Sequence, residues 1–307
     1  MISIILAQKI AAMLFMVFCG FLLVKFGIVK LEDSRVLSLI MLYLIMPSAV
    51  FNTFMVDYST EVRNGILLTA GVALAFHIIM ILLNMGFRRI FHLSGVESAS
   101  TVYSNAGNLI LPIVSGLVGE EYQIYAIGYM AVQLFFMWSH GESLVAGKTR
   151  IQWKKILLNI NMFAVYFGIL FFATGFRLPS PIHTGISAIA SMIGPVAMLV
   201  IGMLLTKIDL KKLILNPKAW IVALLRLIVY PLICILAVKI SGMTGLIENG
   251  KMILLVTMLA VMAPVASTVT QFAQIYDQDA DYAGAISVMT TLMCIITMPL
   301  LTALYQM

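Results

Sequence analysis

Charged side chains are scarce in this sequence, since Asp, Glu, Lys and Arg make up only 10% of its 307 residues. Soluble domains usually carry about 25% charged residues. Hydrophobic residues reach 62%, well above the roughly 45 to 50% of a soluble domain. Apolar runs of about 20 residues, each long enough to cross about 30 Å of hydrocarbon as a helix, recur from end to end. The composition excludes a soluble globular protein and predicts an integral membrane protein.

Cysteine and membrane-embedded acidic residues are also scarce. The three cysteines, Cys19, Cys234 and Cys294, fall inside apolar runs without the paired spacing of a zinc or redox motif. We therefore interpret them as small buried hydrophobic residues, and we predict no metal site. Asp and Glu are absent from the middle of every apolar run, which argues against a proton relay built on carboxylates.

Enzyme motifs are missing as well. The segment "GESLVAGKTR" resembles a phosphate-binding loop, but Glu142 stands where the motif needs its first glycine, and no strand precedes it. The acidic run Asp277 to Asp281 resembles the start of a calcium loop, but Tyr282 stands where that loop needs glycine. We find no nucleophile elbow, zinc-protease motif or dinucleotide fingerprint. The sequence predicts neither an enzyme nor a bound cofactor.

The apolar runs predict an all-α membrane domain of ten transmembrane helices. The connections are too short to hold a soluble domain of their own. Five helices would form a first repeat over residues 1–150, and five would form a second over residues 151–307. The predicted spans are 3–24, 36–56, 64–86, 97–118, 122–141, 156–175, 186–206, 217–240, 251–276 and 282–304.

Lys and Arg gather on one side of this predicted topology. Loops after even-numbered helices hold four, whereas loops after odd-numbered helices hold thirteen: Lys25, Lys30, Arg35, Arg88, Arg89, Lys148, Arg150, Lys154, Lys155, Lys207, Lys211, Lys212 and Lys218. Because cytoplasmic loops are enriched in these residues, both termini are predicted on the extracytoplasmic side. The net charge of +6 reflects mainly this asymmetry, so no nucleic-acid partner is implied.

Interruptions fall at corresponding places in the two halves. Pro47 in the second span pairs with Pro195 in the seventh, and "NAGNLILPIVSGLVG" in the fourth pairs with "APVASTVTQFAQIYD" in the ninth. Membrane helices tolerate single prolines as simple kinks. Paired interruptions in two halves of opposite topology instead point to the binding site of a secondary transporter. We therefore predict that helices four and nine are broken, near residues 105–112 and 263–268, and cross near the bilayer midplane.

Polar residues at these interruptions form the predicted site. Non-helical backbone at membrane depth persists where protein or a watery cavity satisfies its polar groups. The N–H groups that start a second half-helix carry positive partial charge, so two such ends facing one point favour an anion. The predicted substrate-binding residues are Asn105, Asn108, Pro112, Pro264, Ser267, Thr268, Gln271 and Arg226, and Ser104, Thr270 and Gln271 are candidates for binding a coupling ion.

The order of these segments resembles the auxin efflux carrier family, which contains plant PIN proteins and bacterial malonate and malate permeases. The resemblance spans nearly the whole chain and includes "SNAGNLILPIV", "GPVAMLVIGMLL" and "APVASTVTQFAQIYDQD". It implies a crossover fold similar to sodium/bile acid symporters. Helices 1, 2, 6 and 7 would form a scaffold that mediates a homodimer, and helices 3–5 and 8–10 would form the moving bundle. The long loop of PIN proteins between helices five and six is here only a short basic segment.

Several questions stay open at the level of sequence. Arg226, inside the eighth span, has either a substrate or electrostatic role, or pairs with carbonyl groups or snorkels to the membrane surface. His77 and His140 titrate near neutral pH in water, although such residues are more often structural. Coupling to Na⁺, coupling to H⁺ and uncoupled uniport all remain open, because oxygen ligands can hold Na⁺ without a carboxylate.

We predict a secondary transporter or facilitator in the cell (inner) membrane. It would move a small organic anion, such as malonate, malate, lactate or an auxin-like acid, by alternating access, in contact with membrane lipid. The alternatives are a bile-acid-type sodium symporter of a larger amphipathic acid and a membrane receptor that binds without transport.

Overall fold

The computed structural model describes residues 2–147, 158, 160–207 and 210–307. The described part of the chain is helical, and its extended backbone is limited to one isolated bridge between Ser104 and Val265. In the first half the helices are α1 (Ile2–Lys25), α2 (Asp33–Ile40), η1 (Met41–Ile45), α3 (Met46–Thr53), α4 (Thr60–Phe91), α5 (Gly95–Val102), η2 (Ala106–Ile110), α6 (Leu111–Leu117), η3 (Glu120–Tyr122), α7 (Gln123–Phe136), η4 (Met137–Gly141) and α8 (Glu142–Ala146).

The second half of the described chain is also built of helices. Its helices are α10 (Ile160–Thr174), α11 (Ser180–Ser191), α12 (Ile193–Leu205), α13 (Leu210–Leu215), α14 (Pro217–Leu224), η5 (Leu225–Val229), α15 (Tyr230–Ser241), η6 (Met243–Gly245), α16 (Gly250–Met262), α17 (Ser267–Ile275) and α18 (Ala280–Gln306). The predicted boundary at residue 150 and the basic residues Lys148, Arg150, Lys154 and Lys155 lie outside the described residues.

Five helical runs in the described chain are long and apolar enough to cross a membrane. They are Asp33–Thr53, Thr60–Phe91, Ser180–Leu205, Pro217–Ser241 and Ala280–Gln306. Shorter apolar helices cover Ala11–Lys25, Ile160–Thr174 and Gly250–Met262. Large apolar side chains such as Phe15, Leu67 and Ile296 remain more than half exposed, as expected where lipid rather than water surrounds the protein. The chain is a multi-pass helical membrane protein.

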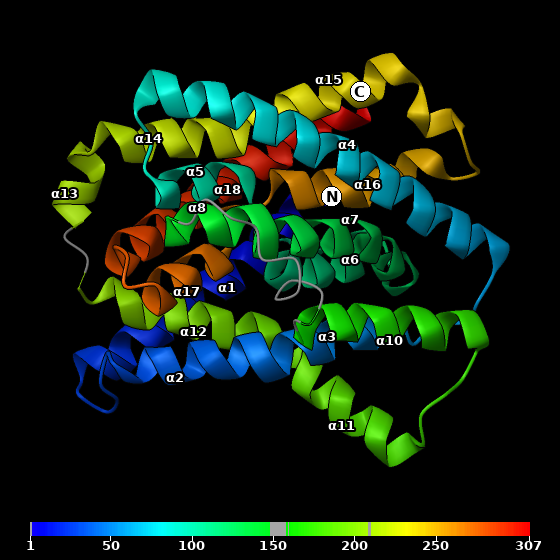
Figure 1. Ribbon diagram of the computed structural model, residues 1–307, viewed down its shortest axis with the longest axis horizontal. Helices are drawn as coiled ribbons and strands as arrows, with labels where there is room; N and C mark the ends of the chain where they lie inside the picture. Colours follow the sequence, from blue (N-terminus) through cyan, green and yellow to red (C-terminus); the bar gives the residue numbers. More distant parts are fainter. Residues whose placement is uncertain (1, 148–157, 159, 208–209) are drawn as a thin grey trace.

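The helices pack in two groups on either side of a central layer. α1 packs on α12, and α10 and α11 pack on α3. The helices α2, α3, α10, α11 and α12 lie along one side of the molecule, α4, α14 and α15 lie along the opposite side, and α5, α7 and α17 lie between them (Figure 1). Two glycines let α1 and α12 approach closely: a Cβ atom on Gly202 would lie 1.9 Å from the carbonyl oxygen of Val17, and one on Gly20 would lie 2.2 Å from that of Leu199.

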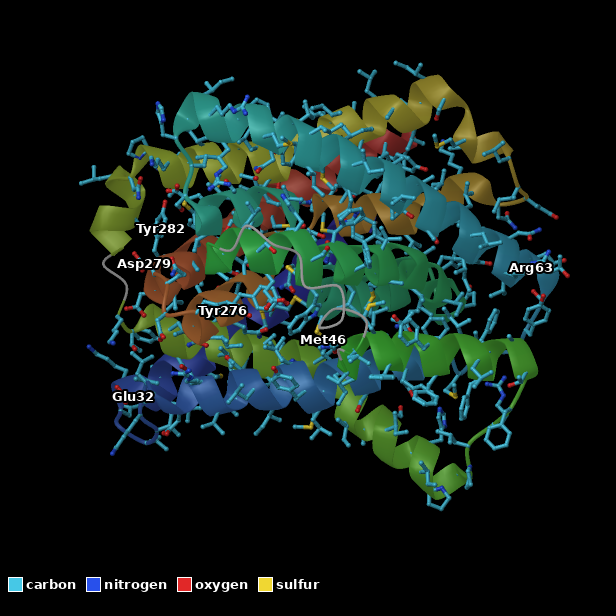
Figure 2. The ribbon with its side chains drawn as sticks, viewed as in Figure 1. Glu32, Met46, Arg63, Tyr276, Asp279 and Tyr282 are labelled. Atoms are coloured by element: carbon cyan, nitrogen blue, oxygen red, sulfur yellow. The ribbon has the colours of Figure 1, made fainter. Side chains whose placement is uncertain are left out.

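The loops gather at the two ends of the long axis. Glu32, Asp279 and Tyr282 lie at one end of the molecule, and Arg63 lies at the other (Figure 2). At the first end, the Lys218 ammonium donates to the carbonyl oxygen of His92 at 2.7 Å. At the second, Arg177 pairs with Asp57. Loops predicted on the same side of the membrane therefore contact one another.

The prolines that we expected to interrupt helices two and seven have milder effects. Pro47 lies in the first turn of α3, directly after the π-helical turn η1, so the helix changes pitch without unwinding. Pro195 lies in the first turn of α12. A single turn residue, Met192, separates α12 from α11. A proline in the first helical turn loses no hydrogen bond, because its N–H would have no intrahelical partner.

Candidate functional site

Two helices are fully unwound in the middle of the molecule. The first interruption, residues 103–105, separates α5 from η2, and the second, residues 263–266, separates α16 from α17. The unwound segments pair with each other: Asn105 N donates to Pro264 O at 2.8 Å, and Ala266 N donates to Tyr103 O at 3.0 Å. The first interruption begins two residues before the predicted range of 105–112 and ends at Asn105, and residues 106–112 are helical rather than unwound. Each unwound segment thus supplies the hydrogen-bond partners that the other lost on leaving the helix.

Arg226 joins the ends of α5 and α16. Its side chain is fully buried, and the π-helical turn η5 sits between α14 and α15 at this position. Nη1 donates to the carbonyl oxygens of Thr101 and Val102 at 3.2 and 2.8 Å. Nε donates to Ala263 O at 3.2 Å, and Nη2 donates to Val261 O. Carbonyl groups in the last turn of a helix lack intrahelical partners, so one guanidinium satisfies the C-terminal ends of both half-helices.

Gln133 of α7 also holds the first interruption, through hydrogen bonds to Ser104. Its Oε1 accepts hydrogen bonds from Ser104 N at 3.2 Å and from Ser104 Oγ at 2.7 Å. Its Nε2 donates to Ser104 O at 2.9 Å. The hydroxyl of Tyr129 lies 3.3 Å from Ser104 Oγ. Gln133 therefore replaces, for Ser104, the backbone partners that a continuous helix would provide.

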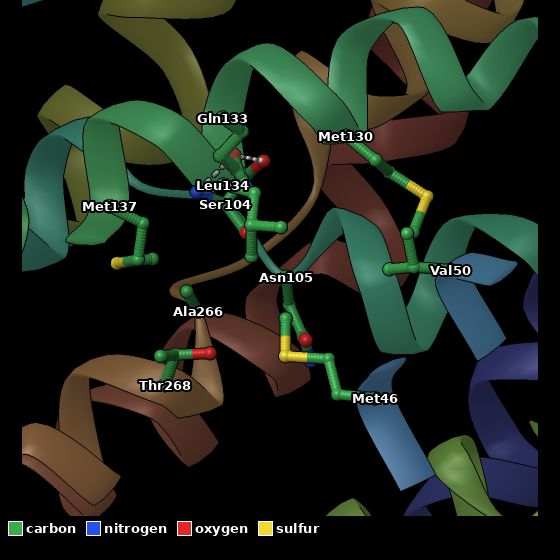
Figure 3. A pocket seen from close by; sticks show the side chains of 10 residues that line it. All are labelled: Met46, Val50, Ser104, Asn105, Met130, Gln133, Leu134, Met137, Ala266 and Thr268. Carbon is green, nitrogen blue, oxygen red and sulfur yellow. Dashed lines mark hydrogen bonds between the residues drawn. The ribbon is translucent and has the colours of Figure 1, made fainter. Parts of the chain in front are cut away.

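A small cavity lies against the two interruptions (Figure 3). Its volume is about 30 Å³, enough for one or two water molecules. Its polar lining residues are Ser104, Asn105, Gln133 and Thr268, and its apolar lining residues are Met46, Val50, Met130, Leu134, Met137 and Ala266. All of these described lining side chains are uncharged. The lining comes from α3, from both interruptions, from α7 and η4, and from the start of α17.

Two half-helices begin at this cavity. Asn105 precedes η2, Ala266 precedes α17, and neither N-terminus has a side-chain cap. The amide nitrogen of Asn105 is buried without a hydrogen-bond partner. Figure 3 shows this side chain directed toward Met46, with Thr268 across the same space. Uncapped N–H groups and an unpaired amide donor together offer hydrogen bonds to an acceptor with negative charge.

The predicted site residues are divided between this cavity and its surroundings. Ser104, Asn105 and Thr268 line it, and Pro264 contributes its carbonyl oxygen to the pairing of the two interruptions. Ser267, Thr270 and Gln271 are buried in α17, where Thr270 Oγ1 and Gln271 Oε1 have no hydrogen-bond partner. Arg226 lies behind the cavity, on the carbonyl side of the interruptions. The side chains of Asn108 and Pro112 lie outside the described part of the structure.

Sequence reasoning missed Gln133, Tyr129 and Met46. Gln133 is an uncharged polar residue in the middle of the apolar run "YAIGYMAVQLFFMW", and polar residues inside membrane segments are usually functional. That position could therefore have been found from the sequence. Tyr129 and Met46 resemble the other aromatic and methionine residues of their helices, and only the tertiary structure distinguishes them.

His77 and His140 lie beside the first interruption. His77 is fully buried, its Nδ1 lies 2.8 Å from Ala73 O, and its ring stacks on Phe136 with centroids 5.5 Å apart. His140 Nδ1 lies 2.8 Å from the hydroxyl of Tyr103. Glu142 is buried and accepts a hydrogen bond from Tyr276 at the end of α17. The end of the fifth span therefore contacts both broken helices.

The unwound, mutually paired segments inside a helical membrane protein define the class of membrane transport proteins, in which broken helices build the binding site. The family model described as membrane transport protein matches residues 5–150 and again residues 143–302. The chain belongs to this family, which is the auxin efflux carrier family, and the resemblance seen in the sequence is confirmed. The family consists of transporters rather than enzymes. No curated protein matches the chain.

Proposed function

We propose that the protein transports a small organic anion by alternating access at the cavity between the two interruptions. The observation that carries this proposal is the convergence of two uncapped half-helix N-termini and the unpaired Asn105 amide on one cavity. Each N-terminus is equivalent to roughly half a positive charge, so the pair presents about one. One carboxylate would balance it.

The lining of the cavity refines the class of anion. Beyond the interruptions, the described walls are methionine, valine and leucine side chains, and no cationic side chain is among them to hold a second carboxylate. Arg226 does not supply this charge, because its donors are directed to four carbonyl groups. We therefore favour a monocarboxylate with an apolar body, such as lactate or an aromatic acetic acid, over the dianions malonate and malate.

The size of the cavity supports a moving site. About 30 Å³ is too small for a carboxylic acid, so the site must widen before substrate enters. In this proposal ten helices form two inverted repeats, and the broken helices cross near the bilayer midplane. α1, α2, α3, α10, α11 and α12 form the scaffold and the homodimer interface. The remaining helices move against them. Both termini lie on the extracytoplasmic side of the inner membrane.

The test is a stability screen of the purified protein with matched ligands. We expect lactate and phenylacetate to raise the thermal unfolding temperature, because the carboxylate accepts a hydrogen bond from the unpaired Asn105 amide and lies at the two half-helix N-termini. Lactamide and phenylacetamide, which have the same shape without the charge, should have no effect. Uptake of the stabilising acid into vesicles, with imposed sodium or proton gradients, then measures transport.

Three outcomes would point elsewhere. Absence of stabilisation by any carboxylate would contradict the proposed anion site. Binding without counterflow would indicate a receptor. Sodium-dependent uptake of a steroid acid would indicate a bile-acid-type symporter.

A further inference from the structure

We infer that the guanidinium of Arg226 permanently takes the place of a coupling cation at the interruptions, so that the protein binds its anion without sodium. The contacts of Arg226 place the guanidinium at the cation's position, whereas binding of the anion rests on the proposed function.

A sodium ion at the interruptions would need oxygen ligands from the unwound backbone. Sodium in transporters with broken helices is held by unwound carbonyl oxygens and by the C-terminal ends of half-helices. In this protein α5 and α16 end at the interruptions, and the carbonyl groups at these ends are directed to one point. Four of them, from Thr101, Val102, Val261 and Ala263, accept hydrogen bonds from Arg226. The guanidinium therefore occupies the oxygen ligands that a cation would need.

The charge of Arg226 matches the partial charge of the two helix ends. The C-terminal end of a helix is equivalent to roughly half a negative charge, so two such ends present about one. Arg226 supplies one positive charge, and its guanidinium remains charged in proteins. The four carbonyl oxygens are already neutralised by a covalently attached cation, and a sodium ion added beside it would meet electrostatic repulsion.

Arg226 and the cavity lie at different ends of the two interruptions. The guanidinium contacts the carbonyl ends of the interruptions, whereas the cavity lies where η2 and α17 begin. The same two breaks thus present negative ends to Arg226 and positive ends to the cavity. Arg226 holds the broken geometry without being a ligand of the substrate, so it is a positioning residue.

The experiment follows thermal unfolding of the purified full-length protein in sodium chloride and in choline chloride. We expect the natural chain to unfold at the same temperature in both salts. We expect Arg226→Ala to unfold at a lower temperature, and low-millimolar guanidinium chloride to restore part of the loss by entering the vacated space. A purely steric role of Arg226 would not respond to a free cation.

Asn84→Ala is the matched control. Asn84 is buried beside the same end of α5, where its amide donates to Thr101 Oγ1 at 2.5 Å and to Ser98 O at 3.3 Å. Its loss should also lower the unfolding temperature, but guanidinium should not restore it because no charged group is missing. Sodium-dependent stabilisation of the natural chain, or equal recovery of both variants, would overturn the inference.

The two salts also test the anion site separately. Stabilisation by lactate or phenylacetate should be the same in sodium and in choline. If carboxylates have no effect in either salt, the proposed anion site is wrong, while rescue of Arg226→Ala still decides the role of the guanidinium. If Arg226→Ala does not fold, the comparison of salts on the natural chain decides, and Arg226→Lys should then fold because it retains the charge.

Discussion

Two buried amide side chains at the first interruption have opposite environments. Gln133 uses both its oxygen and its nitrogen to hold Ser104. The side-chain amide nitrogen of Asn105, the residue that follows Ser104, has no hydrogen-bond partner. A buried polar group without a partner costs about 1 to 3 kcal/mol, so its retention is easiest to explain by a ligand that pairs with it. We therefore assign binding to Asn105 and positioning to Gln133.

We predict that Asn105→Ala weakens binding of the anion and leaves folding intact. The substitution removes an amide nitrogen that has no hydrogen-bond partner in the protein. A hydrogen bond to a charged ligand contributes about 1.5 to 3 kcal/mol, roughly ten- to a hundredfold in affinity. The measurement is the dissociation constant of the stabilising acid, together with the unfolding temperature without ligand. Unchanged affinity in a well-folded variant would show that the site lies elsewhere.

Gln133→Ala should have the opposite pattern. It leaves the backbone N–H of Ser104 without its Gln133 acceptor and the carbonyl of Ser104 without its Gln133 donor, which should lower the stability of the protein by about 1 to 3 kcal/mol. Thermal unfolding without ligand measures this loss. A Gln133→Ala protein as stable as the natural chain would contradict the positioning role.

At the scale of elements, two contacts between helices have an identifiable local cause. Glycines allow α1 and α12 to approach. At one end of the molecule Glu97 joins three helices: it accepts from Ser94 N at 2.7 Å as part of the α5 capping box, from the hydroxyl of Tyr282 in α18 at 3.0 Å, and lies 3.9 Å from Lys218 of α14. All three helices belong to the proposed moving bundle. Such a contact would let them move as one body.

We predict that Gly202→Ala destabilises the protein, whereas Gly71→Ala does not. The new Cβ atom at position 202 would lie 1.9 Å from Val17 O, so α1 and α12 must separate. Overpacking of this kind costs about 1 to 3 kcal/mol. Position 71 has open space around it, and alanine is favoured over glycine there by its helix propensity. Thermal unfolding of both variants checks the pair, and equal stability would contradict the close approach.

We predict that Glu97→Ala lowers stability more than Tyr282→Phe does. The first change removes all three contacts of the carboxylate, and the second removes one hydrogen bond, which contributes about 1 kcal/mol. In a double variant the two losses should not add, because the Tyr282 contact is already gone with Glu97. Additive losses in thermal unfolding would show that the two side chains act independently.

At the scale of the whole molecule, the loops at the two ends differ in charge. Ile28 lies in the basic loop between α1 and α2, and Glu248 lies in the loop before α16. Both are exposed. If the basic end faces the cytoplasm, the two positions lie on opposite sides of the membrane.

We predict that a cysteine introduced at Glu248 reacts with an impermeant thiol reagent in intact cells, whereas one introduced at Ile28 is protected. Cys234 and Cys294 are buried, and Cys19 lies within α1. A variant that lacks all three natural cysteines serves as the background, so that only the introduced cysteine can react. Permeabilised cells should expose both positions and provide the control. Labelling of position 28 alone in intact cells would reverse the predicted orientation.

The sequence alone determined the membrane environment, the family, and the places where helices break. Each rests on a local property: apolar runs long enough to cross hydrocarbon, motifs in a fixed order, and clusters of Asn, Gly, Ser and Pro that weaken a helix. Thus "SNAGN" overlaps the unwound segment 103–105 at Ser104 and Asn105, and "APVAS" contains the unwound segment 263–266. The tertiary structure decided what those segments contact. That Arg226 faces carbonyl groups rather than the cavity, and that Gln133 rather than another polar residue holds Ser104, depends on residues about 30 to 125 positions apart. Such pairings leave no periodicity in the sequence, because they arise only when the helices pack.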